Sequence, residues 1–393
     1  MRKHKIAVVV NDDNVDFNSE FSAVASYLKF VSECFDSEKY DIVLTNGSSN
    51  SSTRVKPNQS QNKLKKVLKN VVKKVLPKTF LKKKENLQRE KVDRISNLFC
   101  NNNFDVIIEF LDYGSTLSSL HKSKQNSKSI IIYDAPLVEK YETFHTYTYD
   151  HLNWIKYGEK QSVENADYIV CYSNSVKSFL DKNFNITSEL SVFPCISGKN
   201  YTTNRNEELG LLRIGFIGSF LKWHKVDLLV EVFDELRKKY SNIKLDLVGK
   251  GLEWESVKEL VNVKQINHLV DLHGFVSEKE LQNIKSRLDI GVMPGSNWYG
   301  SPLKIFEYAQ IPIPVVAASE PTILDLFESN KEILFIDKKE EFNSLYNHLE
   351  QLIKSSDLRN QLSDAIRQKN EKSYSKNAYI SFINNVVEKV INK

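Results

Sequence analysis

The chain has 393 residues, of which 41% are hydrophobic and 27% are charged, and its formal net charge at pH 7 is +5. This composition is typical of globular proteins and excludes the fibrous and intrinsically disordered classes. One hydrophobic core usually stops growing below this length, so we expect two domains.

The sequence offers no signal for export, membrane spanning or structural metal binding. The apolar run near the start, Ile6 to Val10, is too short for a signal peptide or a membrane span. Cys34, Cys100, Cys171 and Cys195 form no Cys-x-x-Cys pair, so neither a disulfide framework nor a zinc site is indicated. We therefore expect a cytoplasmic protein that uses neither a metal nor a cofactor.

Apolar runs typical of buried strands alternate with segments of helical period along the whole chain. This pattern favours parallel sheets covered by helices. The predicted strands are residues 6–10, 41–45, 105–110, 129–133, 168–172 and 190–193 in the first half, and residues 211–217, 244–248, 270–272, 288–293, 314–317 and 332–336 in the second.

The two halves of this pattern predict an α/β protein with two doubly wound domains. A polar stretch divides them, which gives an N-terminal domain over residues 1–200 and a second domain over residues 201–375. The closing segment 376–393 is predicted to be a helix that packs back on the first domain. Because open parallel sheets bind ligands at the carboxyl ends of their strands, we expect a site in a cleft between two facing domains.

The segment from Ile42 to Lys84 is basic. It contains no acidic residue but has Arg54, Lys56 and ten lysines, a local charge of +12. Apolar residues at three- and four-residue spacing predict an amphipathic helix that Pro77 ends. The helix either contacts an anionic membrane surface or packs on its own domain with solvated lysines. Nucleic acid is disfavoured because aromatic residues are absent there. The lysines expected at a membrane are Lys65, Lys66, Lys69, Lys73 and Lys74.

A glycine turn follows the first strand of the second half. The strand runs into Gly218-Ser219, and a segment of helical period begins at Val226. A strand, a glycine turn and a helix start form an anion site from backbone N–H groups and the helix dipole. Lys222-Trp-His-Lys225 places two lysines and an imidazole beside it. The alternative is an exposed basic turn without a ligand.

A second loop opens a helix at Pro302, which is the favoured first helical position for proline. We expect the backbone N–H groups of Gly300 and Ser301 to be free for a diphosphate. Lys304 would oppose the helix dipole, so we expect it to meet an anion rather than to stabilise the helix. Glu307, one turn later, could bind sugar hydroxyls or could be a solvated carboxylate.

Four motifs occur in a fixed order in the second half: 218–229, 247–251, 272–276 and 300–308. They resemble the donor domain of the retaining GT-B glycosyltransferases of family 4, and the resemblance covers residues 211 to 380. The first half is similar only in its strand pattern. The resemblance implies a GT-B fold and a nucleotide-sugar donor. It implies the donor-binding residues Gly218, Ser219, Trp223, His224, Lys225, Gly249, Phe275, Val276, Gly300, Ser301, Pro302, Leu303 and Glu307.

Within this set the resemblance implies separate tasks. The glycine turn and His224 would hold the diphosphate, Phe275 and Val276 would cup the base, and Glu307 would bind the ribose. The chain departs from the family at Tyr299, where a glutamate is frequent, and at Ser219 and His224, which replace an arginine and a lysine. Lys225 and Lys304 could supply the missing charge.

In the first half, the polar candidates nearest to a catalytic role are Tyr133, Asp134 and His145. Asp134 follows a predicted strand, so it should project at the carboxyl edge of the sheet, where it either acts in the reaction or caps a helix or turn. We take Asp134 and Lys304 as the catalytic candidates. Fixed N–H groups and lysines can stabilise a leaving diphosphate, and the sequence has no Asp-x-Asp triplet for a metal.

Three functional hypotheses remain. The first is a metal-independent transferase that moves a hexose or related sugar to a glycan, a lipid-linked acceptor or a cell-surface polysaccharide, peripherally bound at the inner face of the cell membrane. The second is a non-catalytic GT-B-like partner subunit, which the departure at Tyr299 would favour. The third is an epimerase or nicotinamide enzyme, which the absence of Gly-x-Gly-x-x-Gly after the first strand disfavours.

Overall fold

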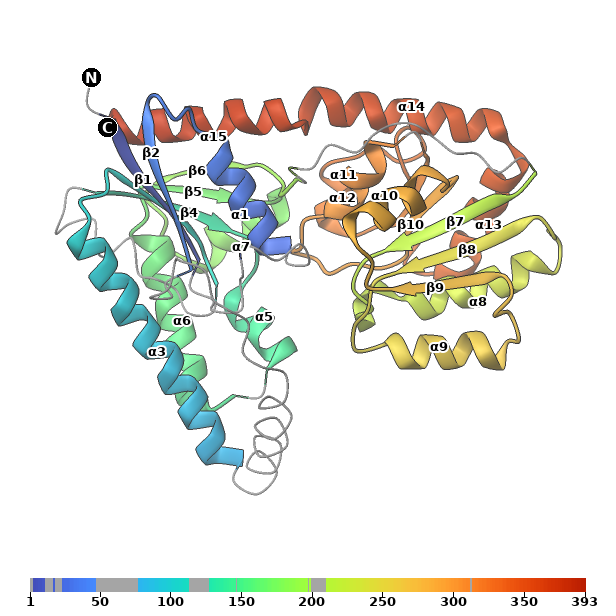
Figure 1. Ribbon diagram of the computed structural model, residues 1–393, viewed down its shortest axis with the longest axis horizontal. Helices are drawn as coiled ribbons and strands as arrows, with labels where there is room; N and C mark the ends of the chain where they lie inside the picture. The colour runs from blue at the N-terminus through green and yellow to red at the C-terminus, as the bar shows by residue number, and fades with distance from the viewer. Residues whose placement is uncertain are drawn as a thin grey trace. The chain divides into compact units, whose positions relative to one another are not determined.

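The computed structural model (Figure 1) describes residues 3–10, 17, 23–46, 77–112, 127–145, 147–196, 198, 210–311 and 313–393. The chain forms two compact units. Unit 1 consists of Met1–Cys171, Val176–Val192 and Ile380–Lys393, and unit 2 consists of Tyr172–Ser175 and Phe193–Tyr379. The predicted basic helix, with Lys65, Lys66, Lys69, Lys73 and Lys74, lies outside the described residues.

Unit 1 is built on a six-stranded parallel sheet with the order β2-β1-β3-β4-β5-β6. Its central strands are runs of β-branched residues that are buried on both faces, as is usual where helices cover a parallel sheet. The strands are β1 His4–Val10, β2 Tyr40–Thr45, β3 Val106–Phe110, β4 Lys128–Tyr133, β5 Tyr168–Cys171 and β6 Glu189–Val192.

The helices of unit 1 include one that the sequence analysis did not predict. Helix α3 begins at Pro77, so this proline opens a helix, a position that suits its fixed φ and missing N–H. Ile95 and Phe99 of α3 pack against Ala7 and Val9 of β1. The helices are α1 Ala23–Glu33, α3 Pro77–Asn101, α5 Leu137–Phe144, α6 Tyr149–Glu164 and α7 Asn174–Asn183.

The last helix, α15 (Lys376–Ile391), runs from unit 2 into unit 1. The side-chain amide of Asn384 donates to the backbone oxygen of Cys34 at 2.9 Å, and Lys389 forms an ion pair with Glu189 at 2.7 Å. The apolar side chains Ile383, Val386, Val387 and Val390 are buried at helical spacing. These contacts hold the C-terminal residues on unit 1.

Unit 2 repeats the architecture with the strand order β12-β11-β10-β7-β8-β9, again entirely parallel. Helices α8, α9 and α13 cover one face, where their apolar stripes form a core with strands β7 and β8. The strands are β7 Leu212–Ile217, β8 Ile243–Val248, β9 Val270–Gly274, β10 Ile290–Met293, β11 Val315–Ala318 and β12 Leu334–Ile336.

The helices of unit 2 alternate with its strands, and the last two follow β12. Helix α10 starts with a capping box, in which the Ser277 side chain accepts from the Glu280 N–H while the Glu280 carboxylate accepts from the Ser277 N–H. The helices are η1 Lys222–His224, α8 Val226–Arg237, α9 Trp254–Val263, α10 Glu278–Ser286, α11 Leu303–Ala309, α12 Pro321–Leu324, α13 Glu341–Lys354 and α14 Ser356–Ser373.

Two parallel sheets confirm the predicted α/β class, and all twelve predicted strands are present with ends shifted by at most two residues. The division between the units falls after Val192, eight residues before the predicted boundary. None of the helices in the described ranges combines the length and apolar character that crossing a bilayer requires.

Candidate functional site

The carboxyl end of β7 approaches the carboxyl end of β8 very closely. The Gly218 N–H donates to the backbone oxygen of Val248 at 2.9 Å. Gly249 has a φ of 119°, and a Cβ at this position would lie 2.0 Å from the backbone oxygen of Gly218. Both the conformation and the space therefore require glycine at 249. The two predicted glycines thus lie against each other.

Lys304 lies over the Gly218 turn. A Cβ at Gly218 would meet the Cε of Lys304 at 1.9 Å and its Nζ at 2.9 Å. The Nζ of Lys304 also lies 3.3 Å from the Nε2 of His224. Three residues predicted from two separate motifs, Gly218, His224 and Lys304, are therefore neighbours at one edge of the unit 2 sheet.

His224 is buried and carries no charge at neutral pH. Its Nδ1 lies 2.5 Å from the backbone oxygen of Ser219. Burial, with a smaller effect of the Lys304 charge, lowers the pKa of His224 to about 3. His224 therefore does not supply the missing charge, which the sequence analysis assigned to Lys225 and Lys304, because the buried imidazole is neutral.

Lys304 places a cation beside the Gly218 turn. Burial lowers the pKa of Lys304 to about 8, while the nearby Glu307 carboxylate acts in the opposite direction. At pH 7 most Lys304 side chains are still protonated. The ammonium group is therefore available to an anion at the turn.

Helix α11 is fixed to β7 by Tyr308. The Ile217 N–H donates to the Tyr308 hydroxyl at 2.9 Å, and this hydroxyl donates to the Gly215 oxygen at 3.2 Å. The ring fills the space beside Gly291, where a Cβ would lie 2.8 Å from it. Tyr308, which the sequence analysis did not single out, thereby sets where Lys304 and Glu307 project.

Glu307 is paired with a lysine that the sequence analysis missed. The Nζ of Lys285 on α10 lies 2.8 Å from the Oε2 of Glu307, and the Lys285 side chain is 1% exposed. The Glu307 side chain is 21% exposed, so it is neither a fully solvated carboxylate nor a buried one. Lys285 and Glu307 are 22 residues apart, and no sequence motif predicts that they pair.

The loop before α11 differs from its prediction at Gly300 and at Pro302. The Gly300 N–H donates to the side-chain oxygen of Asn297 at 2.6 Å, so it is not free for a ligand. The Ser301 hydroxyl donates to the backbone oxygen of Cys195 at 2.9 Å. Pro302 precedes the first residue of α11, Leu303, and serves as its N-cap.

The remaining predicted donor residues of unit 2 surround the same edge. Lys225 has a left-handed φ of 49° and forms an ion pair with Glu341, so its charge is already compensated. The backbone oxygen of Trp223 would lie 2.1 Å from a Cβ at Gly295. The predicted residues Ser219 and Phe275 are exposed, and Val276 is partly buried.

The Gly274 turn brings Phe275 to this edge. The Gly249 N–H donates to the backbone oxygen of Gly274 at 2.8 Å. Gly274 has a φ of 66°, and the Phe275 side chain that follows is 68% exposed. Large aromatic side chains are seldom this exposed. The Phe275 ring is therefore accessible, and it directly follows the Gly274 turn, which is hydrogen-bonded to Gly249.

Asp134 lies in unit 1, directly after β4, and it does not cap a helix. Its Oδ2 is 2.9 Å from the Nζ of Lys140, which also lies 3.5 Å from Asp112. Pro136 is the N-cap of α5 and makes no side-chain capping bond. Burial raises the pKa of Asp134, although Lys140 opposes this effect. Asp134 is therefore not the N-cap of α5, and its carboxylate belongs to an ion-pair cluster.

Tyr133 and Glu159 form a buried pair beside this cluster. The Tyr133 hydroxyl donates to Glu159 at 2.5 Å, and the Leu137 N–H donates to the same oxygen at 2.7 Å. Burial raises the pKa of Glu159 to about 7, although both hydrogen bonds oppose this effect. The ring of His145, the third polar candidate, lies against the Tyr141 ring with a centroid distance of 4.5 Å and an interplanar angle of 36°.

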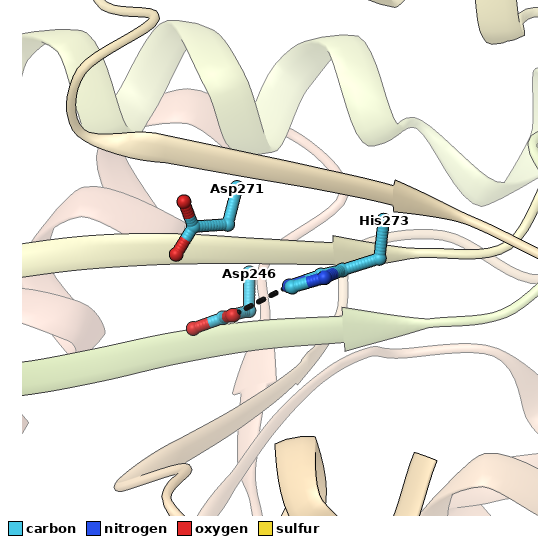
Figure 2. Close-up of side chains that lie close together, drawn as sticks. All are labelled: Asp246, Asp271 and His273. Carbon is cyan, nitrogen blue, oxygen red and sulfur yellow. Dashed lines mark hydrogen bonds and ion pairs between the residues drawn. The ribbon is translucent and has the colours of Figure 1, made fainter. Parts of the chain in front are cut away.

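One group in the described residues has side chains of the kind that bind metals. Asp246, Asp271 and His273 project from β8 and β9 with ligand atoms within 4.8 Å of one another (Figure 2). Arg213 lies 2.9 Å from Asp246 and 3.1 Å from Asp271. Its guanidinium already supplies the positive charge, and a metal ion would be repelled by it. We interpret the group as an ion network that ties β7, β8 and β9 together.

The architecture of the two units is that of the two-domain α/β GT-B fold. Sucrose-phosphate synthase from Thermosynechococcus elongatus is similar with a TM-score of 0.74 and 14% identity, over 99% of this chain and 100% of that one. HepE from Anabaena, solved in complex with UDP, is similar with a TM-score of 0.69 and 11% identity, over 98% of this chain and 100% of that one.

The sequence of unit 2 carries a more specific likeness. Residues 203–369 match the family model of glycosyl transferases group 1. An uncharacterized glycosyltransferase of Haemophilus influenzae is 26% identical over 213 residues, which are 53% of this chain and 58% of that relative. The match therefore spans only a little over half of the relative's length. The segment that matches the family model includes every predicted donor residue of unit 2.

Proposed function

We propose that the protein is a glycosyltransferase that takes a sugar from a nucleotide-sugar donor bound at the carboxyl edge of the unit 2 sheet. The observation that carries this proposal is the Lys304 ammonium over Gly218, within a segment that matches group 1 glycosyl transferases. The capture of HepE with UDP supports a nucleoside diphosphate as the leaving group.

The chemistry that we propose is electrostatic. Cleavage of the bond between the sugar and the diphosphate develops negative charge on the leaving oxygens, and a fixed ammonium stabilises that charge without reorganisation. Lys304 would supply this charge without a metal. Glu307 would accept hydrogen bonds from the ribose hydroxyls, and Phe275 with Val276 would contact the base.

The stereochemistry and the acceptor are finer parts of the proposal. We propose a retaining hexosyl transfer in which the leaving phosphate accepts the proton of the acceptor hydroxyl, so that no strong base is needed on the opposite face of the sugar. The acceptor would be a glycan, a lipid-linked sugar or a cell-surface polysaccharide. The basic segment around Lys65, Lys69 and Lys73 would bring the protein to an anionic membrane surface.

The experiment is a panel of nucleotide sugars in which binding, hydrolysis and transfer are measured with and without a chelator. The variants are Lys304→Ala and Glu307→Ala, with Lys258→Ala on the outer face of α9 as the matched control. We expect selective turnover that the chelator leaves unchanged, and its loss in both site variants. Turnover in Lys304→Ala at the level of the control would refute the role given to this ammonium.

A second function is favoured by Tyr299, which is buried where a glutamate is frequent in the family. A GT-B-shaped subunit without activity of its own could bind an acceptor or stabilise an active transferase. The same panel separates the two functions, since a subunit of this kind would neither hydrolyse nor transfer any donor. Binding of a donor without turnover would also favour the subunit.

A further inference from the structure

His224 bridges a backbone carbonyl and the Lys304 ammonium. Its Nδ1 lies 2.5 Å from the Ser219 oxygen, and its Nε2 lies 3.3 Å from the Nζ of Lys304. His224 is 7% exposed and ends the short helix η1, which follows the Gly218 turn. Both ring nitrogens are therefore engaged within the protein.

The partners of the two nitrogens define the proton positions. A carbonyl oxygen can only accept a hydrogen bond, so the proton of a neutral imidazole must be on Nδ1. The Nε2 is then an acceptor, and the Lys304 ammonium is a donor that faces it. A proton on Nε2 would instead point toward a positive charge. The contacts are satisfied only by the neutral Nδ1–H tautomer.

Two lysines near Lys304 are already paired with carboxylates. Lys285 is paired with Glu307, the carboxylate one turn along α11. Lys225, which follows His224, is paired with Glu341. His224 is the only group among the described contacts of the Lys304 Nζ that can accept a hydrogen bond from it without neutralising its charge.

We propose that His224 is a positioning residue whose neutral Nδ1–H tautomer holds the Lys304 ammonium over Gly218, so that a nucleoside diphosphate meets Lys304 and not an imidazolium. This role rests on the proposed donor site. It explains why an uncharged ring can stand at a position where the resemblance leads one to expect a lysine. Lys304 on α11 supplies the positive charge, and His224 fixes the position of its ammonium group.

The first test reads the tautomer in the native protein. The chain has eight histidines, and the ¹⁵N signals of His224 are assigned as those missing from His224→Gln in a histidine-labelled sample. We expect a neutral ring with the proton on Nδ1 at every pH from about 5 to about 8. A ring that takes up a proton near its usual pKa of about 6.5, or that carries the proton on Nε2, would overturn the proposal.

The second test measures coupling between His224 and Lys304 with UDP as the probe. We expect His224→Leu to weaken UDP binding about 10-fold with Lys304 present and less than about 2-fold in the Lys304→Met background. His224→Gln, which keeps a hydrogen-bond acceptor, should retain most of the affinity. His268→Gln, at an exposed position of unit 2, is the matched control.

The outcomes separate the proposal from the function on which it rests. An equal loss in both backgrounds would mean that His224 contacts the nucleotide itself, and the positioning role would fall. If the native protein bound neither UDP nor inorganic pyrophosphate, the donor site would be refuted together with this role. The NMR experiment would still decide the tautomer, so a failed donor site and a wrong tautomer are distinguishable even if His224→Leu does not fold.

Discussion

The carboxyl edges of the two sheets are built differently. In unit 2, Gly218, Gly249 and Lys304 approach so closely that a single added Cβ would clash with backbone or side chain. In unit 1, Asp134, Lys140 and Asp112 meet through partly exposed side chains. The comparison teaches that a site made by close backbone approach constrains residue types, whereas a side-chain ion pair can be replaced by many others.

The largest expected effect is on kcat, and it tests whether the catalytic charge lies in unit 2 or in unit 1. We expect Lys304→Ala to lower kcat for sugar transfer by about 10³-fold, because the charge on the leaving diphosphate loses its fixed cation. Asp134→Asn should lower kcat only about 10-fold, since the leaving phosphate can accept the proton. Initial rates on the donor selected from the panel measure both. The reverse order of the two losses would move the catalytic role to Asp134.

The next prediction compares the ion pairs of the two edges. Lys285→Met leaves the Glu307 carboxylate without its partner, and we expect a loss of about 3 kcal/mol in the free energy of unfolding. Lys140→Met should cost about 1 kcal/mol, because the Lys140 side chain is 17% exposed whereas that of Lys285 is 1% exposed. Urea unfolding of each variant measures these values. Recovery of stability in Lys285→Met/Glu307→Gln is expected, and equal costs at the two edges would contradict this account.

These contacts also show what a sequence can and cannot predict. Strands could be placed because their buried β-branched runs are local, and Gly218, His224 and Lys304 could be assigned to one site because each lies in a motif. Lys285 pairs with a residue 22 positions away, and Tyr308 bonds to a residue 91 positions earlier. No local pattern records such partners, since α10 and α11 approach each other only when the sheet has formed.

The buried contacts of unit 1 could not be predicted either, because they also join residues that are far apart in the sequence. The buried pair Tyr133 and Glu159 joins β4 to α6 across 26 residues, and a glutamate on a helix normally indicates a solvated face. Helix α3 was missed because the many charged residues after Pro77 obscure the apolar positions that pack on β1. The sequence also gives no protonation state for His224, because burial and not residue type sets it.

The third prediction uses Glu159 to test whether unit 1 is sensitive to pH. Its pKa in the folded protein is raised to about 7, so the native state binds more protons than the unfolded state between about pH 4.5 and 7. Stability should therefore fall by up to about 3 kcal/mol as the pH rises through this window and then level off. Urea unfolding at a series of pH values measures the fall.

Glu159→Gln is the matched variant, because its amide oxygen can still accept from Tyr133 and Leu137. We expect this variant to lose most of the pH dependence in that window. A native curve that rises between pH 4.5 and 7 would mean that the carboxylate is charged in the folded state and that its hydrogen bonds outweigh its burial.

The smallest expected effect concerns Tyr308, which joins α11 to β7. Tyr308→Phe keeps the ring beside Gly291 but leaves the buried Ile217 N–H without its acceptor, and we expect a loss of about 1 to 2 kcal/mol in the free energy of unfolding. Lys304 and Glu307 project from the same helix. A small shift of α11 should therefore cost more free energy of UDP binding than free energy of unfolding. Tyr346→Phe on α13 is the matched control.

Calorimetric titration with UDP and urea unfolding of the same samples separate the two effects. If Tyr308→Phe lost stability but bound UDP as tightly as the native protein, the hydroxyl would stabilise unit 2 without setting the position of Lys304. If binding weakened several-fold while the control was unchanged, the precision of the unit 2 edge would depend on a bond from α11 to the strand that carries the glycine turn.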